Sequence, residues 1–372
     1  MNNYYMKMAL ELAQKAQGRT SPNPLVGAVI VKNAIVQGTG YHQKAGTPHA
    51  EIHALRAAKD HSRDADMYVN LEPCNHTGRT PPCTEAIINA GIKRVFIGTL
   101  DPNPLVSGRG VERLQAAGIE TVVGILEDES RRLNETFNKY IRQKLPFVAL
   151  KVAQSLDGKM ATATGESQWI TGEAARHHGH GLRNVYDAIL VGIGTVLADN
   201  PSLTCRLPVG GGRDPVRIIV DSRLSITKDA RVLHLDSTAP TIIATTANAS
   251  AERISYLEKM APVLIVNDGP KVHLPSLLKI LGEMEITSLL VEGGSHIISS
   301  FLEEKLIDKY YFYIAPKIIG NKKSPGPFDF TVPLPLAQTL ELINLETLVL
   351  DRDLLITGYP DRKEECDVYR NY

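Results

Sequence analysis

One histidine and two cysteines, in a pattern typical of metal sites, most constrain what this chain can fold into. His49-Ala50-Glu51 is followed by Pro73-Cys74 and then by Cys83. Zinc binds imidazole nitrogen and thiolate sulfur well, and a catalytic zinc keeps three protein ligands and leaves a fourth position for water. His49, Cys74 and Cys83 are therefore the predicted zinc ligands, and the fold must bring their three segments together.

Glu51 is the predicted proton-transfer group of this site. It lies close enough to His49 to exchange protons with a water molecule held by the metal, without being a ligand itself. This arrangement of histidine, glutamate and two cysteines is typical of zinc deaminases that act on nucleobases. The alternative is that these are unrelated core residues, because free cysteine is often a small buried hydrophobe.

The secondary structure expected around the ligands favours the metal site. A helix over 49–59, a strand over 67–71 and a helix over 84–90 place both cysteines near a helix N-terminus, where the dipole favours thiolate. The polar segment 75–82 separates the cysteines. It is either a plain loop or a small lobe that carries His76 and Arg79 toward an anionic substrate.

Alternating helices and strands predict two α/β domains, since 372 residues exceed the usual size of one hydrophobic core. Besides the three elements named above, the first half is expected to contain helices at 4–17, 109–117 and 127–144, and strands at 25–31, 35–41, 93–98 and 119–124. Leu145-Pro146 ends the last helix and marks the domain boundary. The second half is expected to contain strands at 147–153, 186–191, 216–221, 240–245, 263–266 and 287–291, then apolar runs at 309–315, 339–346 and 347–357 that form an antiparallel end.

Three Gly- or Ser-bearing strand exits in the second half indicate a dinucleotide site. They are residues 191–195, 220–223 and 291–296. Ligands of open α/β sheets bind outside the carboxyl ends of the strands, and backbone N–H groups at such turns bind anions. The G-x-G-x-x-G fingerprint is absent from the sequence, so a standard Rossmann domain is not expected.

Charge and cysteine content narrow the class of protein. Lysine plus arginine equals aspartate plus glutamate, at 41 each, whereas a nucleic-acid binder usually carries a strongly basic face. Of the four cysteines, two are assigned to the metal and the other two show no pairing logic, which suits a reducing cytoplasm. No apolar run reaches the ~18 residues of a membrane span. We therefore expect a cytoplasmic protein without nucleic-acid or membrane partners, and a polar, frayed tail over 361–372.

Taken together, these motifs resemble the bifunctional deaminase/reductase family of riboflavin biosynthesis. The matching segments are residues 21–29, 49–51, 72–74, 81–83, 101–104, 151–159 and 167–171. The resemblance covers roughly residues 1–358. It implies an α/β protein with a cytidine-deaminase-like three-layer domain at 1–145 and a dihydrofolate-reductase-like domain at 146–360.

The resemblance also implies the chemistry of both halves. The first would hydrolytically deaminate 2,5-diamino-6-(5-phosphoribosylamino)pyrimidin-4-one with one Zn2+ per chain, and the second would reduce the ribosyl group to ribityl with NADPH. The partners would be small phosphorylated pyrimidines, in a homo-oligomer. The alternatives are a nucleic-acid or nucleotide deaminase with an accessory binding domain, and one active half beside a scaffold half.

Site residues carry over position by position from the resemblance. The deaminase substrate would contact Asn23, His42, His76, Arg79, Asp101 and Asn103. NADP would contact Ala153, Trp169, Thr195, Asp199, Ser222, Gly294, Ser295, His296, Ile297, Ile298, Ser299 and Ser300. The reductase substrate would contact Ser167, Arg183, Leu203, Arg206 and Glu292, with Lys151 and Asp199 as catalytic groups.

Several of these positions have plainer interpretations. The family often has lysine at the position of Arg79, which keeps the charge but changes the geometry. Trp169 could be a core anchor, and Arg183 and Arg206 could be solvated charges. Arg223 is a further candidate for the cofactor's 2′-phosphate.

Overall fold

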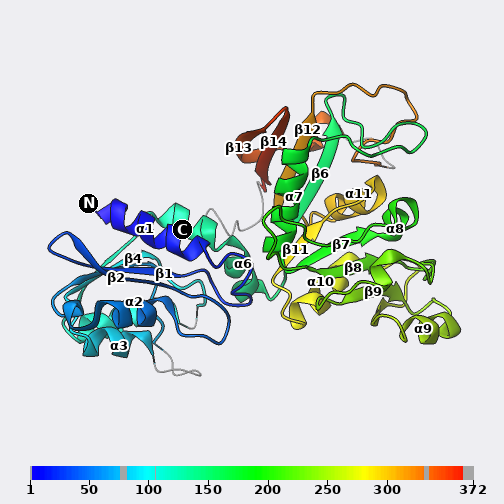
Figure 1. Ribbon diagram of the computed structural model, residues 1–372. Coiled ribbons are helices and arrows are strands. Elements are labelled where there is room, and N and C mark those ends of the chain that lie inside the picture. Colours follow the sequence, from blue (N-terminus) through cyan, green and yellow to red (C-terminus); the bar gives the residue numbers. More distant parts are fainter. Residues whose placement is uncertain (1, 76–81, 105, 331–334, 363–372) are drawn as a thin grey trace. The chain divides into compact units, whose positions relative to one another are not determined.

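The computed structural model describes residues 2–75, 82–104, 106–330 and 335–362, and the chain divides into two compact units at Lys144/Leu145 (Figure 1). The first unit is built on a five-stranded sheet in the order β2-β1-β3-β4-β5. Strand β1 is antiparallel to β2 and β3, and β3, β4 and β5 are parallel. The strands are β1 (Gly27–Lys32), β2 (Ile35–Tyr41), β3 (Asp66–Leu71), β4 (Arg94–Thr99) and β5 (Glu120–Val123).

Helices cover both faces of this sheet, which makes the first unit three layers thick (Figure 1). Alternate residues of β1 enter different cores: Val29 packs with α1, and Ile30 packs with α2. One face carries α1 (Asn2–Gln14) and α5 (Glu127–Leu133), and the other carries α2 (Ala50–Ala58), α3 (Cys83–Asn89) and α4 (Arg109–Ala116). A 3-10 turn follows α2 (Lys59–Ser62), and α6 (Glu135–Gln143) ends the unit.

Glycines on β2 fix the position of α2 and therefore of His49, which precedes it. A Cβ atom at Gly40 would lie 2.4 Å from the carbonyl oxygen of Ala50, and one at Gly38 would lie 2.4 Å from that of Ala54. Ala50 and Ala54 are completely buried. The helix therefore packs backbone to backbone against the strand, which leaves its first turn little freedom to move.

The predicted continuous helix over 127–144 is wrong, because the chain breaks at Asn134. This side chain is buried, and its Oδ1 accepts a hydrogen bond from the Leu25 N–H at 2.7 Å while its Nδ2 donates to the Leu25 carbonyl at 2.9 Å. Asn70 donates to the same carbonyl at 2.9 Å and accepts from the Gly27 N–H at 2.8 Å. These two amides hold the segment before β1, which carries Asn23.

The second unit is built on a nine-stranded sheet in the order β10-β9-β8-β7-β11-β6-β12-β14-β13. All neighbouring pairs are parallel except β12–β14 and β14–β13. The strands are β6 (Phe147–Ser155), β7 (Ala188–Gly192), β8 (Val216–Val220), β9 (Thr241–Thr246), β10 (Val263–Asn267), β11 (Ser288–Val291), β12 (Lys309–Ala315), β13 (Leu342–Leu350) and β14 (Asp353–Pro360). The carboxyl ends of β6, β7, β8, β9 and β11 therefore meet at one edge.

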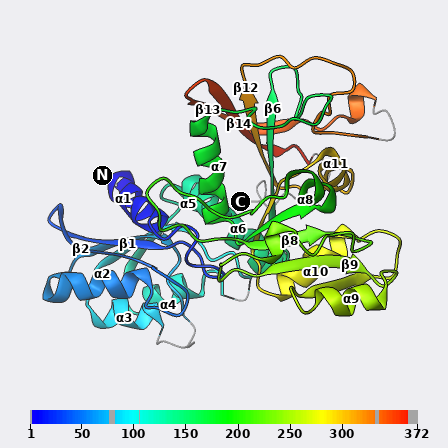
Figure 2. The same ribbon diagram turned by 45° about the vertical axis from the view of Figure 1, so that its right-hand side comes forward.

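Helices cover both faces of the second sheet as well (Figure 2). Helices α10 (Leu274–Glu283) and α11 (Ser295–Glu303) pack on one face, and α7 (Glu173–Val185), α8 (Ile193–Asp199) and α9 (Ala251–Leu257) pack on the other. Strand β6 shows why: Val148 and Leu150 face the first group, and Phe147 and Ala149 face the second. Two 3-10 turns complete the unit, Arg231–Leu233 and Leu336–Gln338.

The antiparallel end is present, but the predicted limits of its last two strands are wrong. The expected break between 346 and 347 falls inside β13, and the hairpin turns at Asp351-Arg352 instead. Asp351 has φ of 61°, a left-handed conformation that aspartate tolerates better than most residues. No glycine or proline marks the turn, so the sequence pattern could not place it.

Within the described ranges, every helix is too short or too polar to cross a membrane.

Candidate active sites

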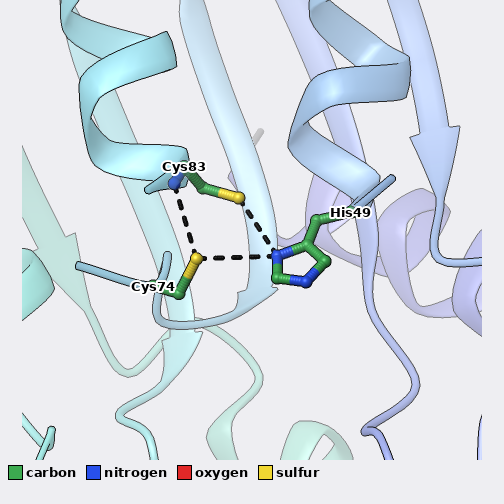
Figure 3. Close-up of side chains that lie close together, drawn as sticks. All are labelled: His49, Cys74 and Cys83. Carbon is green, nitrogen blue, oxygen red and sulfur yellow. Dashed lines mark hydrogen bonds between the residues drawn. The ribbon is translucent and has the colours of Figure 1, made fainter. Parts of the chain in front are cut away.

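His49, Cys74 and Cys83 converge in the first unit, as the sequence predicted (Figure 3). His49 immediately precedes α2, Cys74 follows β3, and Cys83 opens α3. The His49 Nδ1 atom lies 3.2 Å from the Cys83 sulfur and 3.5 Å from the Cys74 sulfur. The sequence could not show which ring nitrogen faces the sulfurs; the structure turns Nδ1 toward them.

The geometry of the three side chains fits a tetrahedral zinc ion. Zinc bonds of about 2.0 Å to nitrogen and about 2.3 Å to sulfur separate tetrahedral ligand atoms by roughly 3.5 Å. The observed nitrogen–sulfur distances are close to this value, and the three ligand atoms lie within 4.8 Å of one another. The donor set of one imidazole and two thiols is also one that zinc prefers.

Two features of the site favour the thiolate form of Cys74. Its sulfur accepts a hydrogen bond from the Cys83 N–H at 3.4 Å, at the start of α3. Hydrogen bonds from the Cys83 side chain and the His49 ring outweigh burial and lower the pKa of Cys74. A metal ligand must be deprotonated, so this environment prepares Cys74 to bind a cation.

Glu51 is buried in the first turn of α2 and lies beside the ligands. Only 3% of the residue is exposed, and its Oε2 has no hydrogen-bond partner among the residues that the structure describes. Burial, with the charge of Cys74, raises the pKa of Glu51 to about 7. A buried carboxylate oxygen without a partner is costly unless it serves a bound molecule.

Asn23 and His42 form a pair beside the metal ligands. The His42 Nδ1 lies 3.2 Å from the Pro48 carbonyl oxygen, so this nitrogen carries the proton and donates. The His42 Nε2 therefore accepts a hydrogen bond from the Asn23 Nδ2 at 3.2 Å. His42 is buried, and burial lowers its pKa, which keeps the ring neutral.

Asp101 and Asn103 lie together in the segment after β4. The Asp101 Oδ1 accepts a hydrogen bond from the Asn103 N–H at 2.8 Å, and both residues are half-buried. The two other predicted substrate residues, His76 and Arg79, lie outside the described residues. In the sequence both lie between Cys74 and Cys83. Asn75, in the same segment, accepts a hydrogen bond from the Thr84 hydroxyl at 2.9 Å.

In the second unit, two of the three predicted strand exits touch. The Thr195 hydroxyl, after β7, accepts a hydrogen bond from the Gly294 N–H, after β11, at 3.1 Å. Gly293 has φ of 122°, a conformation that requires glycine at this turn. The third exit, after β8, carries Ser222 with Oγ accepting from the Val272 N–H at 3.0 Å, and Arg223, which is exposed.

Only part of the predicted cofactor segment 294–300 faces this edge. Gly294 and His296 are exposed, and Ser295 is half-buried at the start of α11. Ile298 is completely buried in the core, and Ile297 packs beneath Gly192. The Ser299 hydroxyl accepts from the Asp329 N–H, and the Ser300 hydroxyl donates to the His296 carbonyl.

A buried charge cluster lies between α7, the middle of β6 and the carboxyl end of β11. Arg183, from α7, forms a bidentate pair with Glu292 at 2.9 and 3.0 Å, and Lys151 lies 3.8 Å from the same carboxylate. Burial alone would raise the pKa of Glu292, but the charges of Arg183 and Lys151 lower it to about 2. Burial also lowers the pKa of Lys151. The interpretation of Arg183 as a solvated charge is therefore wrong.

The remaining predicted residues of the second unit differ in exposure. Leu203 is buried, Ala153 and Ser167 are half-buried, and Asp199 and Arg206 are exposed. Trp169 is 60% exposed, so it is not a core anchor. The Arg176 guanidinium lies 4.5 Å from the centre of its indole ring.

Sequence reasoning missed the histidines of α7. The His180 Nδ1 accepts a hydrogen bond from the Arg206 N–H at 3.3 Å, and burial with the charges of Arg183 and Arg206 lowers its pKa to about 4. The His178 Nδ1 lies 2.6 Å from the Tyr313 hydroxyl. The signal was present as three histidines in 177–180, on the helix that carries Arg183.

Comparison with known proteins agrees with both sites. Residues 1–99 match the cytidine and deoxycytidylate deaminase zinc-binding region, and residues 146–355 match the RibD C-terminal domain. The riboflavin biosynthesis protein RibD of Bacillus amyloliquefaciens is 44% identical over 100% of both chains. The chain belongs to the RibD family. The Aquifex aeolicus RibD protein is 51% identical over 95% of this chain and 96% of its own.

Solved RibD structures share the whole architecture. An Acinetobacter baumannii RibD structure has a TM-score of 0.86 at 38% identity and covers 96% of this chain and 98% of its own. A Thermotoga maritima structure, named as a diaminohydroxyphosphoribosylaminopyrimidine deaminase/5-amino-6-(5-phosphoribosylamino)uracil reductase, has a TM-score of 0.84 at 40% identity, with the same coverage. The predicted fold class is thereby confirmed. As a RibD protein, the chain is a bifunctional deaminase and reductase of riboflavin biosynthesis that uses zinc and NADPH.

Proposed function

We propose that the first unit removes an exocyclic amine from a diaminopyrimidinone that bears a ribosylamino phosphate. The observation that carries this proposal is the convergence of His49, Cys74 and Cys83 around the buried carboxylate of Glu51. The same substrate class is named for the Thermotoga maritima relative.

Glu51 is the proposed proton carrier of the deamination. Zinc, held by His49, Cys74 and Cys83, would supply the Lewis acidity that makes water nucleophilic near neutral pH. Glu51 would take a proton from the attacking water and deliver protons to the leaving amine. Its Oε2, which has no partner within the described residues, is the atom suited to this task.

Two pairs of residues are the proposed substrate contacts of the first unit. Asn23 would orient the pyrimidine ring, and His42, which accepts from the Asn23 amide, would fix the orientation of that amide. Asp101 and Asn103 would hold the ribose and its phosphate. The roles of His76 and Arg79 toward the phosphate remain predictions.

We propose that the second unit then reduces the ribosyl group to ribityl. NADPH would supply the hydride, and Lys151, Asp199 and Glu292 are the polar groups proposed around the sugar carbon that accepts it. Thr195, Ser222 and the first turn of α11 lie at the sheet edge where dinucleotides bind. Ala153 and Trp169 are proposed to complete the cofactor site.

The substrate side of the reductase is proposed to contain Ser167, Leu203, Arg183 and Arg206. Arg206 is exposed and free to form a fork onto phosphate oxygens. The described bonds of Arg183 go instead to Glu292 and, at 3.2 Å, to the Thr204 carbonyl. We therefore propose that Arg183 mainly holds Glu292 in place.

Assignment of the two activities to residues 1–145 and 146–360 is part of this proposal. A cytoplasmic location and a homo-oligomer remain predictions.

The direct test incubates the purified protein with the diaminopyrimidine, with and without NADPH, and follows ammonia release and NADPH oxidation separately. We expect ammonia in both mixtures and NADPH oxidation only after ammonia release. Absence of ammonia from a zinc-loaded sample would reject the proposal for the first unit.

A further inference from the structure

Glu72, two positions before the Cys74 ligand, makes an unusual number of backbone contacts. The residue is 5% exposed, and its carboxylate accepts hydrogen bonds from four backbone N–H groups. The Oε2 atom accepts from Asp101 and Gly108, both at 3.0 Å. The Oε1 atom accepts from Gly110 at 2.8 Å and from Val111 at 3.2 Å.

The four donors lie at the two ends of the segment that connects β4 to α4. Gly110 and Val111 lie in the first turn of α4, where N–H groups have no partner within the helix and where a negative charge is favourable. Asp101 lies at the other end, just after β4. One carboxylate therefore holds both ends of the segment that carries Asp101 and Asn103.

Glu72 also connects the segment between β4 and α4 to the metal ligand Cys74. A Cβ atom at Gly110 would lie 2.2 Å from the Pro73 carbonyl oxygen and 3.0 Å from the Glu72 Oε1, so α4 packs directly on the Glu72-Pro73 backbone. Only Pro73, with its fixed φ, separates Glu72 from Cys74. The Cys74 carbonyl in turn accepts from the Thr84 N–H at 3.3 Å.

We propose that Glu72 is a positioning residue of the deaminase, which sets Asp101 and Asn103 at a fixed distance from the Cys74 turn. It acts through these two residues and does not touch the substrate. The inference rests on the proposed function, in which Asp101 and Asn103 hold the ribosyl phosphate end. Substrate binding should therefore depend on Glu72 more than the chemical step does.

Glu72→Gln separates these effects with little change in shape. A glutamine offers one carbonyl oxygen, and its NH2 group would face two of the four backbone donors. Loss of hydrogen bonds to a charged acceptor weakens the attachment of residues 101 and 108–111 to Glu72. Glu85→Gln is the matched control. Glu85 forms a half-buried pair with Arg113 at 2.7 Å between α3 and α4, and among the described residues its carboxylate bonds to this guanidinium and not to the backbone of 101–110.

The experiment measures zinc content, deamination kinetics and backbone hydrogen exchange in both variants. For Glu72→Gln we expect full zinc content, faster exchange at residues 101, 108, 110 and 111, and a KM for the diaminopyrimidine raised roughly tenfold. The kcat should change less than about threefold, because Glu51 and the ligands stay in place. Glu85→Gln should resemble the wild type in all three measurements.

An unchanged KM despite faster exchange would overturn the proposal, since Glu72 would then be merely structural. Loss of zinc with a matching fall in kcat would overturn it too, by placing the effect at the metal. If Glu72→Gln does not fold, Glu72→Asp keeps the charge but shortens the side chain by one methylene, and it should raise KM likewise. Failure of the proposed function is distinguishable, because the wild type itself would then release no ammonia.

Discussion

The two units place their reactive groups in opposite ways. In the first, all three metal ligands lie at the ends of short neighbouring elements, at His49, Cys74 and Cys83. In the second, the central charge pair joins Arg183 to Glu292 across 109 residues of sequence. The first site is recognisable from side-chain types and spacing, and the second exists only once the sheet has formed.

The difference follows from what each site has to bind. A zinc ion restricts both the kind of ligand and the distances between ligand atoms, so its site leaves a compact signature in the sequence. A dinucleotide is bound along the edge of a sheet by glycine turns and hydroxyls, none of which is diagnostic alone. If the two sites are independent, a change at one of them leaves the activity of the other intact.

Removal of a metal ligand should have the largest effect and should be confined to the first unit. Cys74→Ser and Cys83→Ser should lose zinc and all ammonia release, while reduction of supplied deaminated product continues. Metal analysis and the two separate assays check this, with Cys205→Ser in the second unit as the control that keeps zinc. Full zinc content in both variants would contradict the assignment of Cys74 and Cys83 as zinc ligands.

Glu51→Gln should abolish deamination without disturbing the metal. Glutamine is nearly isosteric but cannot carry a proton, and general acid–base groups contribute about 10²–10⁴-fold in rate. Zinc content should stay at the wild-type level. A rate of ammonia release within about threefold of the wild type would mean that another group moves the protons.

Arg183→Leu should destabilise the second unit more than any surface change, because it leaves Glu292 buried beside Lys151 alone. Removal of one partner of a buried pair costs about 3–5 kcal/mol. Unfolding by urea, with deaminase activity followed in parallel, measures the effect on each unit. A decrease in the free energy of unfolding of less than about 1 kcal/mol would show that water solvates the Glu292 carboxylate in the variant.

The same pair predicts how stability responds to acid. The folded pKa of Glu292, about 2, lies below its ordinary value of 4.5. The contribution of Glu292 to the free energy of unfolding is therefore complete above pH about 4.5, and it is lost as the pH falls toward 2. Glu292→Gln should remove this part of the acid dependence, and an unchanged pH profile of unfolding would contradict the pairing.

Arg206→Ala should raise the KM of the reductase for its phosphorylated substrate by roughly ten- to a hundredfold. A charge-assisted contact contributes about 1.5–3 kcal/mol, and phosphate binding is largely the same in ground and transition states. The dephosphorylated substrate serves as the control and should be little affected. Equal losses with both substrates would assign Arg206 a structural role.

The smallest effect is expected at the third strand exit. NADPH should be preferred to NADH, because Ser222 and Arg223 offer donors for the 2′-phosphate. Steady-state kinetics with both cofactors, in the wild type, Ser222→Ala and Arg223→Ala, test each donor separately. Equal kcat/KM for NADPH and NADH in the wild type would reject this prediction.

Much of the fold could be read from the sequence, because hydrophobic periodicity and local signals agree. Strands β2 and β12 have the predicted limits, and α2 and α3 begin within one residue of theirs. The failures lie where a distant contact decides a local feature. Asn134 interrupts the helix at 127–144 because its amide binds Leu25, which is far away in the sequence.

The same distinction separates the predicted site residues from the missed ones. Glu72 stands beside a recognised cysteine, but its four backbone partners lie 29 to 39 positions later and cannot be inferred from spacing. The Arg183–Glu292 pair was hidden in the same way, since each residue alone resembles an ordinary surface charge. Contacts between segments that meet only through the sheet leave no local pattern.

The central claim, that one chain contains two separate active sites, is tested most directly with Glu51→Gln and two substrates. NADPH oxidation by this variant is measured first with the diaminopyrimidine and then with the deaminated product. Our account predicts no oxidation above background with the first and a wild-type rate with the second. Loss of NADPH oxidation with both substrates would contradict it, because the buried glutamate of the first unit would then be required for chemistry in the second.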